Sequence, residues 1–233
     1  MSIIISNEEI AKDIYLMTIE GEYQGKMGQF YMLRSWNRYP VLSRPISIHN
    51  IDNGSIQFLY KVFGEGTRMF AELKSGDSIG LEGPFGNGFP EPEGKVAMVG
   101  GGIGIAPFYF AAKHIPEADV YLGFGQEAYL VDEFKQVARQ VVTNVGRSII
   151  EDIEPDQYDM VYVCGPHGMM HAVADKAKHS SAKVYVSLEK RMACGIGACL
   201  VCSVICHEGN KRACVDGPVF LAEEVNFDAE NGL

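Results

Sequence analysis

Apolar and polar positions divide the chain into two parts with different periods. Residues 13–20, 29–33, 45–49 and 55–63 alternate at the spacing of strands, and turn residues such as 52–54 and 74–77 separate them. One helical turn is expected at residues 67–73, after a glycine-rich break. Short strands joined by close turns predict an antiparallel β-barrel or sandwich, and we expect a barrel over residues 1–91.

After a polar, proline-containing linker at residues 91–94, strands begin to alternate with helices. Strands are expected at 95–99, 118–123, 140–144, 160–164 and 184–188, and helices at 106–114, 130–139 and 169–179. This order predicts an α/β domain with a doubly wound parallel sheet over residues 92–188. Residues 189–233 are rich in glycine and cysteine, and we expect them to form a small third module.

Composition limits the classes of function that remain. The 233 residues are 47% hydrophobic and carry a formal charge of −10 with no dense basic run, so a globular fold is expected and non-specific nucleic-acid binding is disfavoured. The longest uncharged stretch, residues 96–112, is interrupted by glycines and a proline, so no transmembrane helix is expected. The first residues lack a secretory pattern, which favours a cytoplasmic location.

Cysteine spacing is the most specific signal. Cys194, Cys199, Cys202 and Cys214 follow the C-x4-C-x2-C…C spacing of plant-type ferredoxins, which hold a [2Fe–2S] cluster. Small residues between them let backbone amides approach the sulfurs. A structural zinc site with four cysteine ligands is the alternative. Cys206 competes as the fourth ligand, but its short separation from Cys202 favours Cys214.

Two other motifs fit anionic cofactors. The glycines of residues 99–107 lie where an apolar strand runs into a helix, an arrangement that binds a dinucleotide pyrophosphate or simply allows tight packing. The segments at 44–47 and 59–67 place an arginine and a lysine on neighbouring strands, which could hold an anion or face solvent. The six histidines form no set with ligand spacing.

Taken in order, six motifs form one series: RPIS (44–47), LYK with GEGT (59–67), GPFGNGF (83–89), VGGGIGIAP (99–107), CGP (164–166), and MACGIGACLVC with CVDGPVF (192–220). This series resembles the electron-transfer subunit of class B dihydroorotate dehydrogenase, a branch of the ferredoxin reductase superfamily, over residues 14–225. Phe85, Val201 and Cys206 depart from the pattern expected of that family.

The resemblance implies three cofactors, FAD, NAD and a [2Fe–2S] cluster, and a residue set for each. For FAD the set is Arg44, Pro45, Ile46, Ser47, Leu59, Tyr60, Lys61, Gly66 and Thr67; for NAD it is Gly100, Gly101, Gly102, Gly104, Pro107, Cys164, Gly165 and Pro166. The cluster ligands are Cys194, Cys199, Cys202 and Cys214. Ser47 and Cys164 are expected to shape the flavin and nicotinamide sites. Gln126 and Glu127 offer no arginine for a 2′-phosphate, which favours NAD over NADP.

The resemblance also implies an activity and a partner. Electrons would pass from dihydroorotate through FMN on a separate catalytic subunit to the cluster, to FAD and to NAD⁺, in pyrimidine biosynthesis. A heterotetramer with two copies of each subunit is expected, with residues 195–200 as the candidate contact loop. Two alternatives remain: the small subunit of another NAD(P)H-linked ferredoxin or sulfide oxidoreductase, and a zinc-stabilised interaction module.

Overall fold

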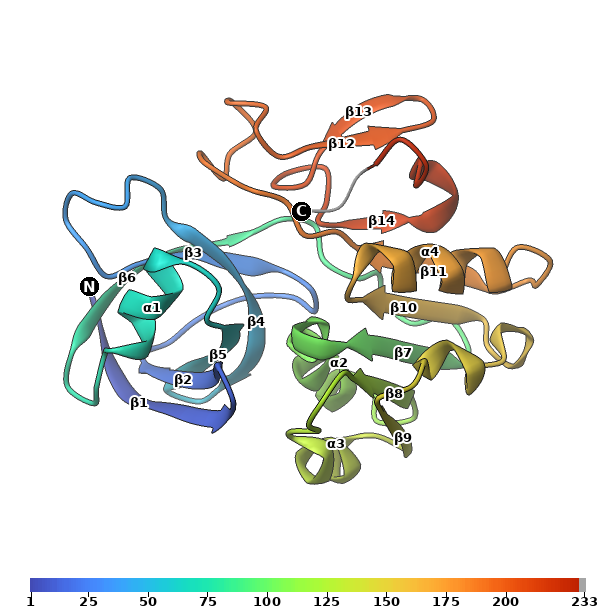
Figure 1. Ribbon diagram of the computed structural model, residues 1–233, viewed down its shortest axis with the longest axis horizontal. Coiled ribbons are helices and arrows are strands. Elements are labelled where there is room, and N and C mark those ends of the chain that lie inside the picture. The colour runs from blue at the N-terminus through green and yellow to red at the C-terminus, as the bar shows by residue number, and fades with distance from the viewer. Residues whose placement is uncertain (231–233) are drawn as a thin grey trace.

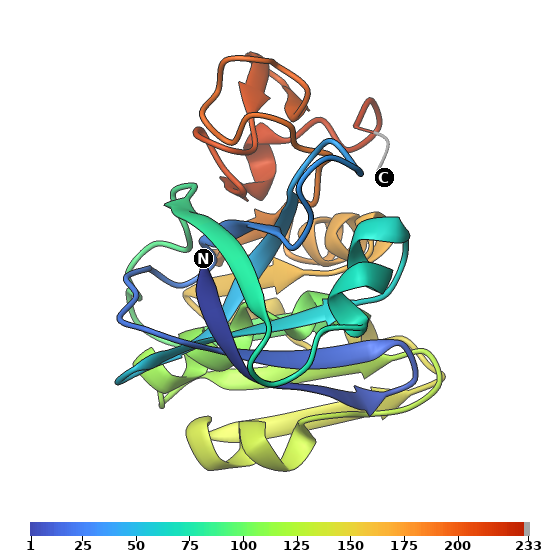
Figure 2. The ribbon, with the colours of Figure 1, turned by 90° about the vertical axis from the view of Figure 1, so that its left-hand side faces the viewer.

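A computed structural model describes residues 1–230 as three packed parts (Figure 1). The predicted barrel and parallel-sheet domain are both confirmed, and the cysteine-rich residues lie at the top of both views, over the two parts (Figure 1 and Figure 2). The third module was expected to extend to residue 233, and its last three residues lie outside the described ones. Within residues 1–230, no helix combines the length and the hydropathy needed to cross a bilayer.

The N-terminal part is a closed antiparallel barrel in the order β1-β2-β5-β4-β3-β6. Its strands are β1 (Ser2–Ala11), β2 (Ile14–Glu20), β3 (Phe30–Arg34), β4 (Arg44–Asp52), β5 (Ser55–Lys61) and β6 (Ser78–Phe85). Alternate side chains fill the interior, with Met17, Ile19, Phe58 and Ile79 fully buried. Helix α1 (Glu65–Ala71) packs over the barrel through Phe70.

Two strands of this barrel were not predicted, β1 and β6. They pair with each other at Ser2–Ile79 and Ile3–Ser78 and so close the barrel. The sequence of β1 includes consecutive glutamates, and that of β6 includes Gly83 and Pro84, so neither has a simple alternation. Long-range pairing in the barrel makes them strands, against their local pattern.

The second part is a six-stranded sheet in the order β14-β11-β10-β7-β8-β9. Its strands are β7 (Val96–Gly101), β8 (Asp119–Phe124), β9 (Gln140–Val145), β10 (Met160–Cys164), β11 (Lys183–Ser187) and β14 (Val219–Leu221). The strands are parallel except β14, which pairs with β11 in the antiparallel direction. The edge beside β11 is therefore completed by a strand from the cysteine-rich part of the chain.

Helices cover both faces of this sheet, as a doubly wound fold requires. Helices α2 (Phe108–His114) and α3 (Val131–Val137) pack on one face together with the barrel, and α4 (His167–Lys176) packs on the other. Short 3-10 turns connect elements: η1 (Gly102–Ile105), η2 (Ile149–Glu151), η3 (Pro155–Gln157) and η4 (Ala222–Glu224). The helix expected from residue 106 starts at Phe108, because the glycines before it form the tighter turn η1.

The cysteine-rich module contains one hairpin, β12 (Ser203–Cys206) with β13 (Gly209–Arg212). Cys202 and Cys214 belong to the same buried cluster as Val186 of the parallel sheet and Met32 of the barrel. The module therefore shares its core with both other parts.

Candidate cofactor-binding sites

The four predicted ligand cysteines lie together around the loop that precedes β12. The sulfurs of Cys194 and Cys199 interact as one pair, those of Cys202 and Cys214 as a second, and Cys194 also faces Cys214. Cys199 is exposed, whereas Cys202 and Cys214 are buried. Two pairs of thiols suit two irons, each with two cysteine ligands. Within residues 1–230, no three His, Cys, Asp or Glu side chains are placed to hold one metal ion.

Backbone amides of the loop surround the sulfurs. The N–H groups of Cys199, Ile196 and Ala198 face Cys194 and lower the pKa of its thiol to about 6. Gly195 and Gly197 adopt left-handed φ angles of 70° and 79°, which a residue with a side chain rarely adopts, and this conformation lets the loop curl around the sulfurs. This donor set fits an iron–sulfur cluster.

Cys214 and Cys206 differ in the groups that surround them. Burial, followed by the contact with Cys202, raises the pKa of the Cys214 thiol to about 12. Cys206 lies on β12 beside Lys211 and Glu224. The geometry therefore groups Cys214 with the other three cysteines and places Cys206 in the packing of the hairpin.

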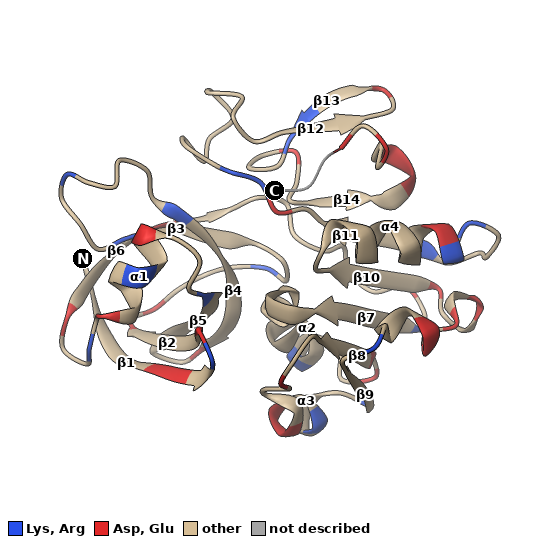
Figure 3. Cartoon of the chain, in the orientation of Figure 1, with Lys and Arg blue, Asp and Glu red and all other residues tan. Residues whose placement is uncertain are grey.

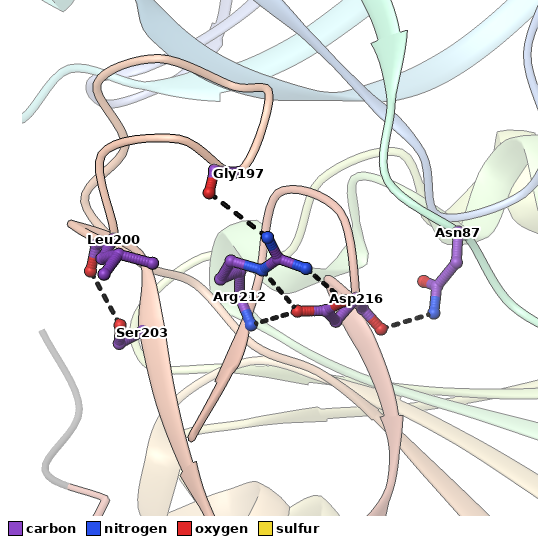
Figure 4. A network of polar contacts seen from close by, with 6 residues as sticks. All are labelled: Asn87, Gly197, Leu200, Ser203, Arg212 and Asp216. Atoms are coloured by element: carbon purple, nitrogen blue, oxygen red, sulfur yellow. Dashed lines mark hydrogen bonds and ion pairs between the residues drawn. The ribbon is translucent and has the colours of Figure 1, made fainter. Parts of the chain in front are cut away.

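An ion pair fixes the shape of the cysteine loop (Figure 4). Arg212 donates from Nε to Asp216 Oδ2 at 2.8 Å and from Nη2 to Oδ1 at 3.1 Å, and its Nη1 reaches the carbonyl of Gly197 at 3.3 Å. Asn87, which follows the barrel strand β6, donates to the carbonyl of Asp216 at 2.9 Å. The barrel thus holds the turn that carries Cys214. Sequence reasoning missed these residues, because Arg212 ends β13 and Asp216 lies in the following turn, where the i,i+4 rule for helices does not apply.

The cysteine loop packs on the barrel strand beside β4, the predicted flavin strand. A Cβ on Gly195 would lie 3.5 Å from Phe85 and 3.6 Å from Met32, so the loop approaches the barrel wall. Met32 pairs with Pro45 on β4, the strand that carries Arg44 and Ser47. A cluster in the loop and a flavin on β4 would therefore share Met32 as a neighbour.

Arg44, the predicted phosphate-binding arginine, is packed against Gly66. A Cβ on Gly66 would come within 2.6 Å of Arg44 Nε and 2.8 Å of the Trp36 ring, so a side chain here would push the arginine or the ring aside. The Arg44 guanidinium lies 5.2 Å from the centre of the Trp36 ring. Thr67 Oγ1 accepts hydrogen bonds from the N–H groups of Phe63 and Gly64. A positive group and a glycine turn at this spacing fit a pyrophosphate.

The remaining predicted flavin residues separate into two groups. Pro45, Ile46 and Ser47 lie partly buried along β4. On β5, Lys61 is exposed, but Tyr60 points into the barrel and donates to Asn7 Oδ1 at 3.0 Å. Leu59 packs in the cluster between the barrel and the parallel sheet. Tyr60 therefore supports the barrel interior.

The two predicted NAD segments touch at the carboxyl edge of the parallel sheet. Gly104 stands so close to the CGP loop that a Cβ would lie 2.4 Å from the carbonyl oxygen of Cys164. Gly101 likewise packs against Pro166 and Met169, and Pro107 precedes α2. A crevice at this edge of a parallel sheet is where doubly wound folds bind dinucleotides.

Cys164 is protonated at neutral pH. Burial, and to a smaller extent the charge of Glu189, raises the pKa of its thiol to about 12, while Ser187 opposes the shift. A thiol of this kind is a poor nucleophile, because the thiolate is the reactive form. Cys164 can therefore shape the nicotinamide site as a small neutral group.

Comparison with known proteins agrees with this geometry. Residues 189–226 match the family described as the iron–sulfur cluster binding domain of dihydroorotate dehydrogenase B. The chain is 42% identical to the dihydroorotate dehydrogenase B (NAD(+)) electron transfer subunit of Clostridium acetobutylicum, over 95% of both chains. It is 41% identical to that of Clostridium perfringens, again over 95% of both chains.

Solved structures resemble the whole chain or its first two parts. The structure of an NADH-dependent reduced ferredoxin-NADP oxidoreductase, described in connection with flavin-based electron bifurcation, superposes with a TM-score of 0.88 and 29% identity, covering 98% of this chain and 90% of that one. A ferredoxin NADP⁺ reductase from Neisseria gonorrhoeae, with FAD and NADP bound, gives a TM-score of 0.64 at 18% identity, covering 76% and 89%. The second likeness shows the fold alone.

Proposed function

Because this chain belongs to the family of electron transfer subunits of NAD⁺-linked dihydroorotate dehydrogenase B, we propose that it carries electrons between a dihydroorotate-oxidising subunit and NAD⁺, in pyrimidine biosynthesis. The observation that carries the proposal is the identity of 42% over 95% of both chains. The chain is thus the NAD-linked part of an oxidoreductase and contributes no dihydroorotate site in this proposal.

Each cofactor has its own residues in this scheme. FAD is held by Arg44, Gly66 and Thr67 and faced by Ser47; NAD by the turn at residues 100–107 and the loop at 164–166; and the cluster by Cys194, Cys199, Cys202 and Cys214. When bound, the flavin supplies the exchange between the two-electron chemistry of a nicotinamide and the one-electron chemistry of an iron–sulfur cluster. In this proposal the protein supplies position, by holding the three cofactor sites side by side.

The partner subunit is expected to dock on the cysteine loop. Residues 192–202 carry no charged side chain (Figure 3), and Ile196 and Leu200 expose 66% and 62% of their surface. An exposed apolar group beside an electron carrier suits a protein interface. We assign FMN to the partner, two copies of each subunit to the complex and the cytoplasm as its location, where thiols stay reduced.

Replacing one ligand tests the electron path. Cys199→Ser is expected to remove the visible absorption and the electron paramagnetic resonance signal of the cluster, to leave FAD bound and to abolish dihydroorotate-dependent reduction of NAD⁺. Cys206→Ser is the matched control, since Cys206 lies within the hairpin packing, and should keep cluster and activity. A Cys199→Ser protein that still transferred electrons at the wild-type rate would contradict the ligand assignment.

The partner is tested by purifying the tagged protein without oxygen from its native host. The expected complex reduces NAD⁺ with dihydroorotate. The structural likeness to an NADH-dependent reduced ferredoxin-NADP oxidoreductase supports the second candidate, an electron-transfer subunit with another partner. A complex that contains FAD and cluster and oxidises NADH with an artificial acceptor, but is inactive with dihydroorotate, would favour that candidate.

A further inference from the structure

His49 occupies an irregular position on the predicted flavin strand, two residues after Ser47. In the pairing of β4 with β5, Ile48 faces Phe58 and Asn50 faces Gln57, so the register shifts and His49 has no partner of its own. Such a β-bulge turns a side chain to a new direction. As a result Ile48, His49 and Asn50 are all buried, which regular alternation would not allow.

The bulge directs His49 at the NAD segment. Nδ1 of the imidazole lies 2.8 Å from the carbonyl oxygen of Ala106, the residue that follows η1, and the ring stacks on Tyr109 of α2 with centroids 5.1 Å apart. The side chain is 2% exposed, so the contact is shielded from water. Strand β4 and helix α2 lie side by side at this junction (Figure 1).

The same turn is fixed from its other side. The close approach of Gly104 to the Cys164 carbonyl holds η1 against the CGP loop, and the bond from His49 holds it against the barrel. Lys113 adds a second link, to Asn50 and Asp52, but Asp52 is 55% exposed, and exposed ion pairs contribute little. His49 is therefore the principal buried polar link between β4 and the turn.

From this geometry we infer that His49 is a positioning residue, whose bond to the Ala106 carbonyl sets the approach of the nicotinamide to the flavin. The inference rests on the proposed function, since it takes FAD on β4 and NAD on the turn. Burial lowers the pKa of His49 to about 4, which keeps the ring neutral and one nitrogen protonated as the donor. This link holds the flavin site of the barrel and the nicotinamide site of the parallel-sheet domain in one fixed arrangement.

Three substitutions separate this role from simple packing. His49→Asn places an amide N–H where Nδ1 stood, His49→Leu fills the space without a donor, and His49→Met does so with a longer, more flexible side chain. The complete complex is reduced with NADH without oxygen in a stopped-flow instrument. The limiting rate of flavin reduction and the long-wavelength absorbance of the nicotinamide–flavin pair are recorded. Binding of ADP-ribose and hydrogen exchange of residues 100–106 are measured on the same samples.

We expect His49→Leu to slow flavin reduction about 10- to 100-fold and to weaken the long-wavelength band. Exchange at residues 100–106 should rise, ADP-ribose binding should stay within twofold, and His49→Asn should restore most of the rate. If His49→Leu does not retain its cofactors, His49→Met takes its place with the same expectations, since methionine also lacks a donor. A wild-type rate and band in the variant without the donor would overturn the inference, as would an equal loss in His49→Asn.

Failure of the proposed function has a different signature. The wild-type complex would then lack dihydroorotate-dependent reduction of NAD⁺, although NADH still reduced its flavin. The dependence of flavin reduction on His49 is read from the NADH half-reaction alone. The two outcomes are therefore distinguishable.

Discussion

Replacing Gly104 by alanine would separate the two loops that meet at the carboxyl edge of the parallel sheet. The added Cβ would lie 2.4 Å from the Cys164 carbonyl oxygen and 2.6 Å from both the Cys164 carbonyl carbon and Gly165 Cα. All three are backbone atoms, so no side chain can turn aside. Real Cβ atoms stay at least 3.0 Å from such neighbours, and the loops must therefore move apart by 0.6 Å or more.

The size of the effect follows from that displacement. A misplacement of about 1 Å at a reacting centre costs on the order of 100-fold in rate, or about 2.7 kcal/mol of activation free energy. Gly104 lies outside the left-handed region, so alanine adds no backbone strain there and the loss comes from the contact. We expect the limiting rate of flavin reduction by NADH to fall about 100-fold. FAD and cluster should remain bound, because their residues lie elsewhere.

The assay is anaerobic stopped-flow reduction of the flavin at saturating NADH, with cofactor content checked by absorption. Gly125→Ala is the matched control, since a Cβ there meets nothing within 4 Å and the residue also avoids the left-handed region. It should react at the wild-type rate. A folded, fully loaded Gly104→Ala protein within twofold of the wild-type rate would refute the reasoning, as would an equally slow Gly125→Ala protein.

Three other predictions concern stability. Burial lowers the pKa of His49 from 6.5 to about 4, so the unfolded chain binds a proton before the folded chain does as the pH falls. The stability present above pH 6.5 is therefore lost toward pH 4, by about 3 kcal/mol in full. Thermal unfolding measured from pH 7.5 to 4.5 should show a smaller loss in His49→Asn than in the wild type. Tyr158→Phe removes the hydroxyl that donates to Asp119 at 2.8 Å and should lower the unfolding free energy by about 1–3 kcal/mol without changing NADH kinetics, as denaturant titration and stopped-flow will check. Glu230→Gln removes the charge paired with Lys190, and because Glu230 is 2% exposed, the free energy of unfolding should fall by about 3 kcal/mol or more. Thermal scans should show a lower unfolding midpoint and loss of the cluster absorption at a lower temperature. An unchanged midpoint would contradict the buried pair.

The sequence predicted most of what depends on local pattern. Strand β2 and the strands of the parallel sheet follow apolar runs that are visible without a structure. The cysteine spacing predicted that four thiols would lie close together. Strand β14 has only three residues and exists because β11 offers it an edge, so no periodicity could reveal it.

The contacts that link the sites could not be predicted from local sequence pattern either, because they join residues far apart in the chain. His49 bonds a carbonyl 57 positions away, and Asn87 bonds one 129 positions away. A backbone carbonyl has no residue-type signature, so the sequence does not indicate which side chain will find it. The bulge that turns His49 toward α2 likewise depends on the pairing of two strands.

The short strand β14 ties the maturation of the iron–sulfur site to the completion of the sheet. The chain runs from Cys214 to Val219 in five residues, so a bond from Cys214 to the cluster would restrain β14 at its place beside β11. Whenever β14 is displaced, β11 presents Val184, Tyr185 and Val186 along an unprotected edge, the kind of surface along which chains aggregate. Cells that produce this chain faster than they assemble clusters should therefore accumulate more of it in insoluble form, because ligation of Cys214 would help to hold the edge strand in place.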